Sequence, residues 1–189
     1  MYLPQHFAQT DPRALQAPMA QHPLATLVTL AADGVTADHL PLEFSADTAP
    51  HGTLRGHVAR ANTLWRHADG ATVLAVFCGP QAYVSPNWYP TKAATHKVVP
   101  TWNYAVVHAH GVLRTVDEAA WLRALVGRLT QQHEHAQARP WSIEEAPADY
   151  IEQMLGAIIG VEIALTRLVG KWKGGLPSST RWTPPRWRQ

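Results

Sequence analysis

One cysteine in 189 residues excludes an internal disulfide, and no cysteine–histidine pattern has the spacing of a zinc site. A chain that does without disulfides is typical of a reducing cytoplasm. No apolar run approaches about 20 residues, and the N-terminus lacks the basic-then-apolar pattern of a signal peptide. We therefore expect a cytoplasmic protein that neither spans a membrane nor is secreted.

The motifs of several enzyme classes are also missing. The chain has no Gly-x-Ser-x-Gly elbow and no Walker or dinucleotide glycine fingerprint. Cys78 lies inside an apolar strand-like run, which predicts a small buried side chain. The pairs His108-Ala109-His110 and His133-Glu134-His135 lack further ligands at metal-site spacing. The sequence thus predicts no catalytic residue and no metal site.

Acidic residues are missing from one end of the chain. Residues 1–165 hold all 14 acidic side chains against 10 lysines and arginines, whereas the last 24 residues hold six basic side chains and no acid. Such a segment faces an anion, an acidic surface or water. Interleaved prolines disfavour a regular helix there. We therefore divide the chain into a domain over residues 1–170 and a basic, Trp/Pro-rich tail over residues 171–189, packed on the domain or on a partner.

What is present favours one domain rich in strands, because 189 residues with 46% apolar side chains suit a single buried core. Asp33-Gly34 predicts a hairpin turn. Strands are expected over residues 26–32, 36–44, 52–58, 73–78, 81–85, 106–114 and 158–168. Helices are expected over residues 11–17, 61–66, 119–132 and 148–155, with capping boxes at Thr115 and Ser142. This pattern indicates an α+β fold with an antiparallel sheet, most simply a closed or split barrel.

Three polar clusters between the strand-like runs carry the functional signal, namely residues 56–62, 79–89 and 97–104. Each sets hydrogen-bond donors or a cation beside aromatic faces, a mixture that suits a flat heteroaromatic ligand carrying a phosphate. Arg60 and Asn62 stand at an expected strand-to-helix junction, where backbone N–H groups and a guanidinium can converge on a phosphate. A solvated arginine and a helix-capping asparagine are the plainer alternative, and both interpretations stay open.

Other members of these clusters have plain alternatives as well. His57 can add a donor, although a lone histidine on a strand is more often structural. Lys97 is either a cation at a strand mouth or a surface lysine. Trp102-Asn103-Tyr104 either surrounds a ligand with aromatic rings or packs at a barrel seam.

These residues resemble one family, the FMN-binding negative transcriptional regulators related to PaiB, which share the flavin-reductase-like split β-barrel. The likeness runs in order through Met1-Tyr2-x-Pro4-x-His6-Phe7, His39-Leu40-Pro41-Leu42 and residues 56–62, 76–89 and 97–104. It departs at the end, where relatives tend to carry Lys-Leu-Ser-Gln-Asn, whereas Lys171-Trp172-Lys173-Gly174-Gly175-Leu176 keeps the lysine and loses the rest.

The resemblance implies an antiparallel split β-barrel with peripheral helices, FMN as cofactor, and a homodimer whose interface forms the flavin sites. It also implies negative action on gene expression. The side chains that it places at the cofactor are, for the phosphate, His57, Arg60 and Asn62, and, for the ring and its surroundings, Lys97, Thr101, Trp102 and Asn103.

Two further functions stay open. A flavin-dependent oxidoreductase or flavin reductase would use the same FMN cleft. A nucleic-acid binder would use the arginines and tryptophans of the tail. No helix-turn-helix is recognisable and a net charge of +2 is weak for a DNA-binding protein. A tail that folds over the dimer interface is therefore favoured over direct DNA contact.

Overall fold

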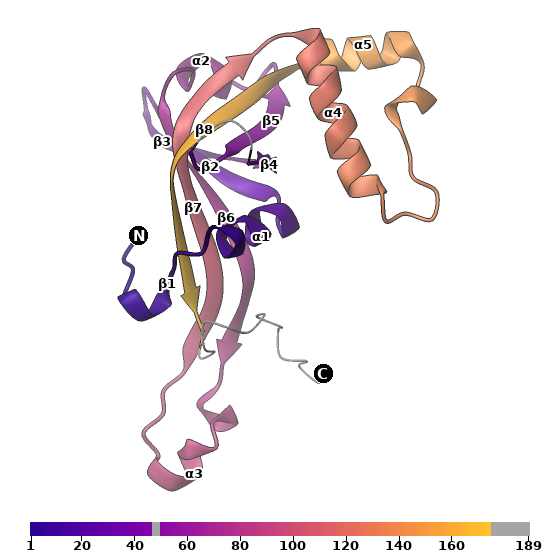
Figure 1. Cartoon of the computed structure of the whole chain (residues 1–189). Helices are drawn as coiled ribbons and strands as arrows, with labels where there is room; N and C mark the ends of the chain where they lie inside the picture. The colour runs from indigo at the N-terminus through magenta and orange to yellow at the C-terminus, as the bar shows by residue number, and fades with distance from the viewer. Residues whose placement is uncertain (47–49, 175–189) are drawn as a thin grey trace.

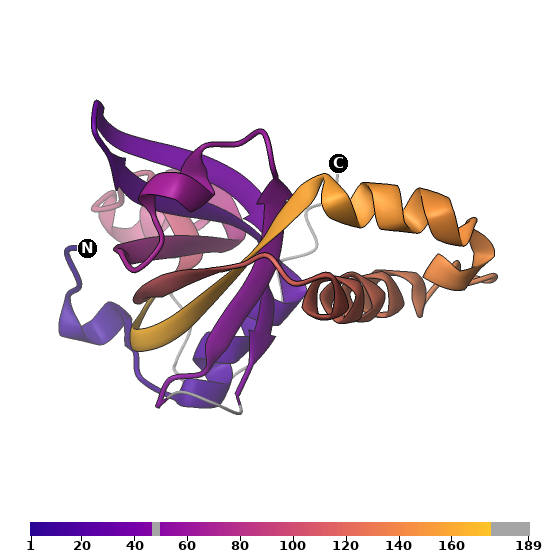
Figure 2. The same ribbon diagram turned by 90° about the horizontal axis from the view of Figure 1, so that it is seen from above.

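The computed structural model describes residues 1–46 and 50–174, and an antiparallel sheet of eight strands dominates it. The strands are β1 (Ala8–Gln9), β2 (Leu24–Ala31), β3 (Gly34–Pro41), β4 (Glu43–Ser45), β5 (Thr53–Ala59), β6 (Thr72–Val84), β7 (Thr101–Val116) and β8 (Ile158–Lys173). Their order is β3-β2-β6-β7-β8-β5-β4, and β1 pairs with β8. The sheet curls on itself, but its edge strands β3 and β4 do not pair within the described residues (Figures 1 and 2). The predicted α+β split β-barrel with peripheral helices is confirmed.

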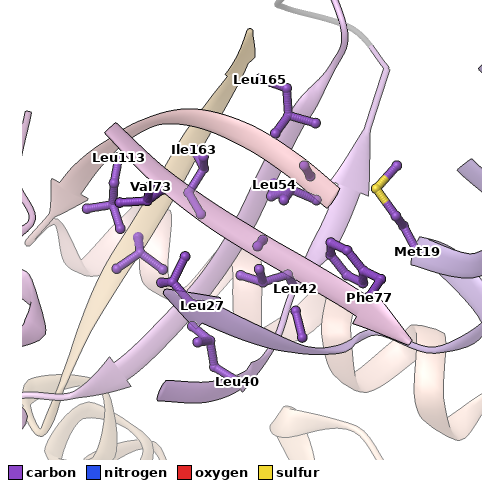
Figure 3. Close-up of a cluster of buried hydrophobic side chains, with 14 of the residues drawn as sticks. Met19, Leu27, Leu40, Leu42, Leu54, Val73, Phe77, Leu113, Ile163 and Leu165 are labelled. Atoms are coloured by element: carbon purple, nitrogen blue, oxygen red, sulfur yellow. The ribbon is translucent and has the colours of Figure 1, made fainter. Parts of the chain in front are cut away.

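Strand alternation builds the core. Along β7 the residues at odd positions from Ala105 to Leu113 are buried, and those at even positions face the outside of the barrel. Phe77 and Met19 fill the interior together with side chains from most of the long strands (Figure 3). Cys78 was predicted to be buried, and this is wrong. Its position next to Phe77 in β6 turns it to the outer face, where it is exposed.

Two strands predicted around Gly79-Pro80 are one. β6 continues from Thr72 to Val84, and the register of its pairing with β7 shifts between Cys78 and Gln81. A proline cannot donate to a strand ladder, and a bulge removes the need for that hydrogen bond. The resulting β6–β7 arm projects from the barrel and carries η2 (Pro86–Trp88) and α3 (Thr91–Thr95) at its tip (Figure 1).

The helices lie outside the barrel. They are α1 (Pro12–Gln21), α2 (Leu64–His67), α4 (Ala119–Glu134) and α5 (Ala148–Gly156), with short turns η1 (Gln5–Phe7) and η3 (Ile143–Glu145). The predicted cap of α1 is confirmed, because Asp11 accepts a hydrogen bond from the Arg13 N–H at 3.0 Å. The capping box at Ser142 is also confirmed. α4 and α5 run beside each other away from the barrel (Figure 2).

The capping box predicted at Thr115 is wrong. The first cap position of α4 is Glu118, because Thr115 and Val116 still pair with β8 and keep an extended backbone. The Thr115 N–H donates to the Asp69 carboxylate at 2.9 Å instead of starting a helix. Strand pairing therefore overrides a local helix-start pattern at this junction.

The predicted boundary between domain and tail falls inside β8, which continues through Lys173. The rest of the predicted tail, residues 175–189, lies outside the described residues. No helix in the described part of the chain is both long and apolar enough to cross a membrane.

Candidate functional site

A hollow of about 350 Å³ opens where β3, β5 and the start of β8 meet. This volume falls in the range of roughly 300–1,000 Å³ that is usual for small-molecule sites. Its lining mixes polar and apolar groups: Asp38, His39, Leu40, Pro41, His57, Val58, Ala59, Asn62 and Ile158. The strand-to-helix junction predicted from the sequence is thus part of a hollow, with His57 and Asn62 on its wall.

His57 is the most telling residue of the hollow. Its Nδ1 is buried and has no hydrogen-bond partner within the described residues. Burial lowers the pKa of the imidazole, so the ring is held neutral. Buried polar atoms in proteins are normally satisfied, and an orphan on the wall of a hollow can be satisfied by a ligand.

Asn62 is fixed by hydrogen bonds from both ends of its amide. Its Nδ2 donates to Asp38 Oδ1 at 2.6 Å, and its Oδ1 accepts from the Leu64 N–H at 2.8 Å. The second bond closes the turn just before α2 and is not the helix cap of the plainer alternative, because the cap position of α2 is Thr63 and carries no side-chain cap hydrogen bond. Asn62 therefore fixes the turn before α2 and lines the hollow at once.

Asp38 and His39 are site residues that the sequence reasoning did not select. His39 opens a block on which the family resemblance rests, and Asp38 precedes it on β3. Their proximity to His57 comes from the curl of the sheet, which brings β3 against β5 without pairing them. Of these two residues, only His39 could have been found from the sequence, because it belongs to a block shared with the family.

Arg60 makes a structural clamp in this chain. Its Nη atoms donate to both oxygens of Asp117 at 2.6 and 2.8 Å, and its Nε donates to the Gly156 carbonyl at 2.7 Å. The hydrogen bonds between the two side chains raise the pKa of Arg60 and lower the pKa of Asp117. The guanidinium thereby joins the end of β5 to the end of α5 and the segment before α4. Contact between Arg60 and a phosphate stays a prediction.

If Arg60 is a clamp, Arg60→Gln and Asp117→Asn will each lower the melting temperature, and the double variant will melt no lower than the worse single one. Neighbours that share one interaction are not additive. Thermal unfolding of the four proteins measures this. Two results together would contradict the clamp. The Asp117→Asn protein would have the melting temperature of the wild type, and the Arg60→Gln protein would no longer bind a ligand that the wild type binds.

The other predicted residues gather on the β6–β7 arm. Lys97 is exposed just before β7, and Thr101, Trp102 and Asn103 begin that strand. The Trp102 ring is 54% exposed and meets Tyr83 edge-on, with centroids 6.2 Å apart. The arm points away from the end of β5, so a single chain does not bring these residues to the His57 hollow (Figure 1).

One of the two histidine pairs lies on β7. His108 and His110 lie on the outer face of β7 with ring centroids 6.4 Å apart. Within the described ranges, no three His, Cys, Asp or Glu side chains are placed to hold a metal ion.

The sequence matches a family model described as "Putative FMN-binding domain" over residues 1–167. It is 32% identical to the uncharacterized protein AN0679 of Emericella nidulans, over 92% of this chain and 83% of that protein. It is 29% identical to the protease synthase and sporulation protein PAI 2 of Bacillus subtilis, over 92% of this chain and 81% of that protein.

The fold has a counterpart among solved structures. The flavocytochrome Anf3 from Azotobacter vinelandii aligns with a TM-score of 0.66 at 14% identity, over 96% of this chain and 77% of that chain. A likeness at this level of identity concerns the fold.

Proposed function

Since the chain belongs to the FMN-binding domain family matched over residues 1–167, we propose that it binds FMN and acts as a regulatory protein. The observation that carries the proposal is the orphaned Nδ1 of His57 in a hollow large enough for part of a nucleotide. His57 and Asn62 would hold the cofactor there. Bound FMN would supply redox chemistry and a visible chromophore.

The polar groups of the hollow suit hydroxyl groups as well as an anion. Asp38 accepts hydrogen bonds, Asn62 can do both, and His57 offers one nitrogen. No lysine or arginine is among the described residues that line it. A phosphate bound nearby therefore needs a cation from another segment. The exposed Lys97 of the arm is a candidate for that cation.

Lys97 cannot serve its own chain's hollow from the arm, so we propose that a second copy supplies it in a homodimer. The outer face of the sheet supports this assembly, because Val28, Leu74, Val76 and Val106 are only half-buried there. Leu30 is 71% exposed on the same face. Contiguous exposed apolar surface of this kind marks an interface.

The regulatory part of the proposal rests on kinship. The name of the Bacillus subtilis relative refers to a protease synthase and to sporulation. We extend this to negative control of gene expression, with FMN as sensor or redox centre. Direct DNA contact through residues 175–189 and flavin reduction by a nicotinamide donor remain alternatives to be separated by experiment.

The first experiment is a visible spectrum and a melting curve of purified protein, with and without added FMN. We expect a flavin spectrum and a rise in melting temperature of about 5–10 °C at a hundredfold excess over Kd. Light scattering should give twice the chain mass. A colourless protein whose melting temperature does not change with added FMN would refute cofactor binding. A protein with the mass of a single chain would refute the shared site.

Stopped-flow mixing of the loaded protein with NADH or NADPH separates the regulator from the enzyme. For a regulatory flavoprotein, we expect bound FMN to be reduced no faster than free FMN. Rapid, saturable reduction would instead favour the oxidoreductase alternative.

A further inference from the structure

The last strand of the sheet holds a lysine in an unusual setting. Lys171 pairs with Ala8 of β1 and Val106 of β7, and only 8% of it is exposed. Its Nζ donates to the Tyr2 carbonyl oxygen at 3.0 Å. The same Nζ lies 5.7 and 5.5 Å from the ring centroids of Tyr2 and Tyr104. A buried ammonium normally has a carboxylate partner, because burying a lone charge costs free energy.

No carboxylate forms an ion pair with Lys171 within residues 1–46 and 50–174. The ion pairs there join Arg55 to Glu162, Arg60 to Asp117 and Arg128 to Glu43. One carbonyl and two ring faces stabilise an ammonium only in part. The Lys171 charge is therefore left without a counter-charge from the described chain.

A second ammonium adds to the imbalance. Lys173 is two residues further along β8, hence on the same face, and its Nζ lies 6.0 Å from the same Tyr104 ring. The chain's α-amino group is also close enough to act on His108 and His110. Burial lowers the pKa of both histidines, and the positive α-amino group lowers each pKa further. Positive charges thus converge on this face and repel one another.

We propose that Lys171 and Lys173, beside Tyr104, form an oxyanion site on the outer face of the sheet whose ligand carries a phosphate group. Lys171 uses one N–H on the Tyr2 carbonyl and keeps the others. The Lys173 side chain makes no hydrogen bond to any other described residue, so the described part of the chain leaves its donors to a ligand. Two ammonium groups suit a divalent phosphate better than a single carboxylate, and lysine binds phosphate as a point charge.

This site is separate from the His57 hollow. His57 pairs with Gly160 near the start of β8, and Lys171 lies on the order of 30 Å further along the strand path. Phosphate binding at Lys171 therefore does not require that the hollow bind flavin. A hollow that binds no flavin would therefore leave the Lys171 site standing.

The test is thermal unfolding of the full chain without flavin, in inorganic phosphate and in chloride at equal ionic strength. Phosphate at a hundredfold excess over Kd should raise the melting temperature of the wild type by about 5–10 °C. Lys171→Met keeps the apolar stem and should lose this increment. In chloride it should melt no lower than the wild type, because the unpaired buried charge is gone. Lys92→Met, on exposed α3, should keep the increment.

A second variant covers the case in which Lys171→Met does not fold. Lys173→Met, at a half-buried position, should weaken phosphate binding about 10- to 100-fold. Any general salting effect of phosphate is common to all variants. An equal phosphate response in the wild type and in every folded variant at these two lysines would overturn the proposal.

Flavin titrations identify the source of the phosphate. If the ligand is the phosphate of FMN, Lys171→Met will weaken FMN but not riboflavin, and saturating FMN will abolish the phosphate increment. If another phosphorylated molecule is the ligand, the increment will persist in protein saturated with FMN. Both results support the site, and the first would also place the flavin on this face and not in the His57 hollow.

Discussion

Asn62→Asp is expected to weaken FMN binding at least about 100-fold. The new carboxylate would face Asp38, whose oxygen now accepts a hydrogen bond from Asn62 at 2.6 Å. Two carboxylates in contact repel each other, so the wall of the hollow that holds the cofactor would rearrange. A second negative charge in the hollow would also repel the cofactor's phosphate.

The variant should nevertheless fold. An Asp side-chain oxygen accepts a hydrogen bond as the Asn oxygen does, so the bond from the Leu64 N–H can persist. Quenching of FMN fluorescence on binding gives the affinity. Gln137→Glu adds the same charge at an exposed position after α4 and should bind FMN like the wild type. An Asn62→Asp protein within threefold of the wild-type affinity would show that the flavin binds elsewhere.

Gly56→Ala should cost about 1–3 kcal/mol of folding stability and distort the hollow. A Cβ at this position would lie 2.7 Å from the Pro41 carbonyl oxygen and 2.8 Å from a Leu42 methyl carbon. Pro41 ends β3 and Leu42 links it to β4, so this β3–β4 link passes directly over β5 at Gly56. Backbone cannot move aside as a flexible side chain does, and the wall next to His57 must shift.

Chemical and thermal unfolding measure this loss, which corresponds to a fall in melting temperature of roughly 3–10 °C. Gly156→Ala is the matched control, because its Cβ would meet nothing within 4 Å at the last position of α5. Alanine there should leave stability unchanged or raise it. Equal melting temperatures for the two variants would mean that the β3–β4 link is not held against β5.

The sequence predicted most of the fold because strand alternation and turn chemistry are local. The predicted hairpin is in place, with its turn at Ala32-Asp33 and Gly34 already in β3, and so is the cap at Asp11. Errors occurred where pairing with a distant strand decides the local structure. Pairing with β8 keeps Thr115 extended in spite of its helix-start pattern. Pairing with β7 on both sides of Gly79-Pro80 keeps β6 a single strand.

The candidate site was only half visible in the sequence, for a different reason. His57 and Asn62 were selected, and both line the hollow. Asp38 and His39 were not, because only the curl of the sheet brings β3 to β5. The partner of Arg60 could not be foreseen either, since Asp117 is far away in the chain. An arginine at a strand end is equally suited to a phosphate and to a carboxylate, and proximity in space decides between them.

The pairing of the first strand with the last has a consequence for how the chain is made. Ala8 faces Lys171 and Gln9 faces Gly170, while β5 and β7 also take β8 as a neighbour. During translation β1, β5 and β7 lack their pairing partner until β8 leaves the ribosome. The sheet is therefore completed after synthesis of nearly the whole barrel, which makes folding slow and leaves apolar strand edges open to aggregation in the meantime.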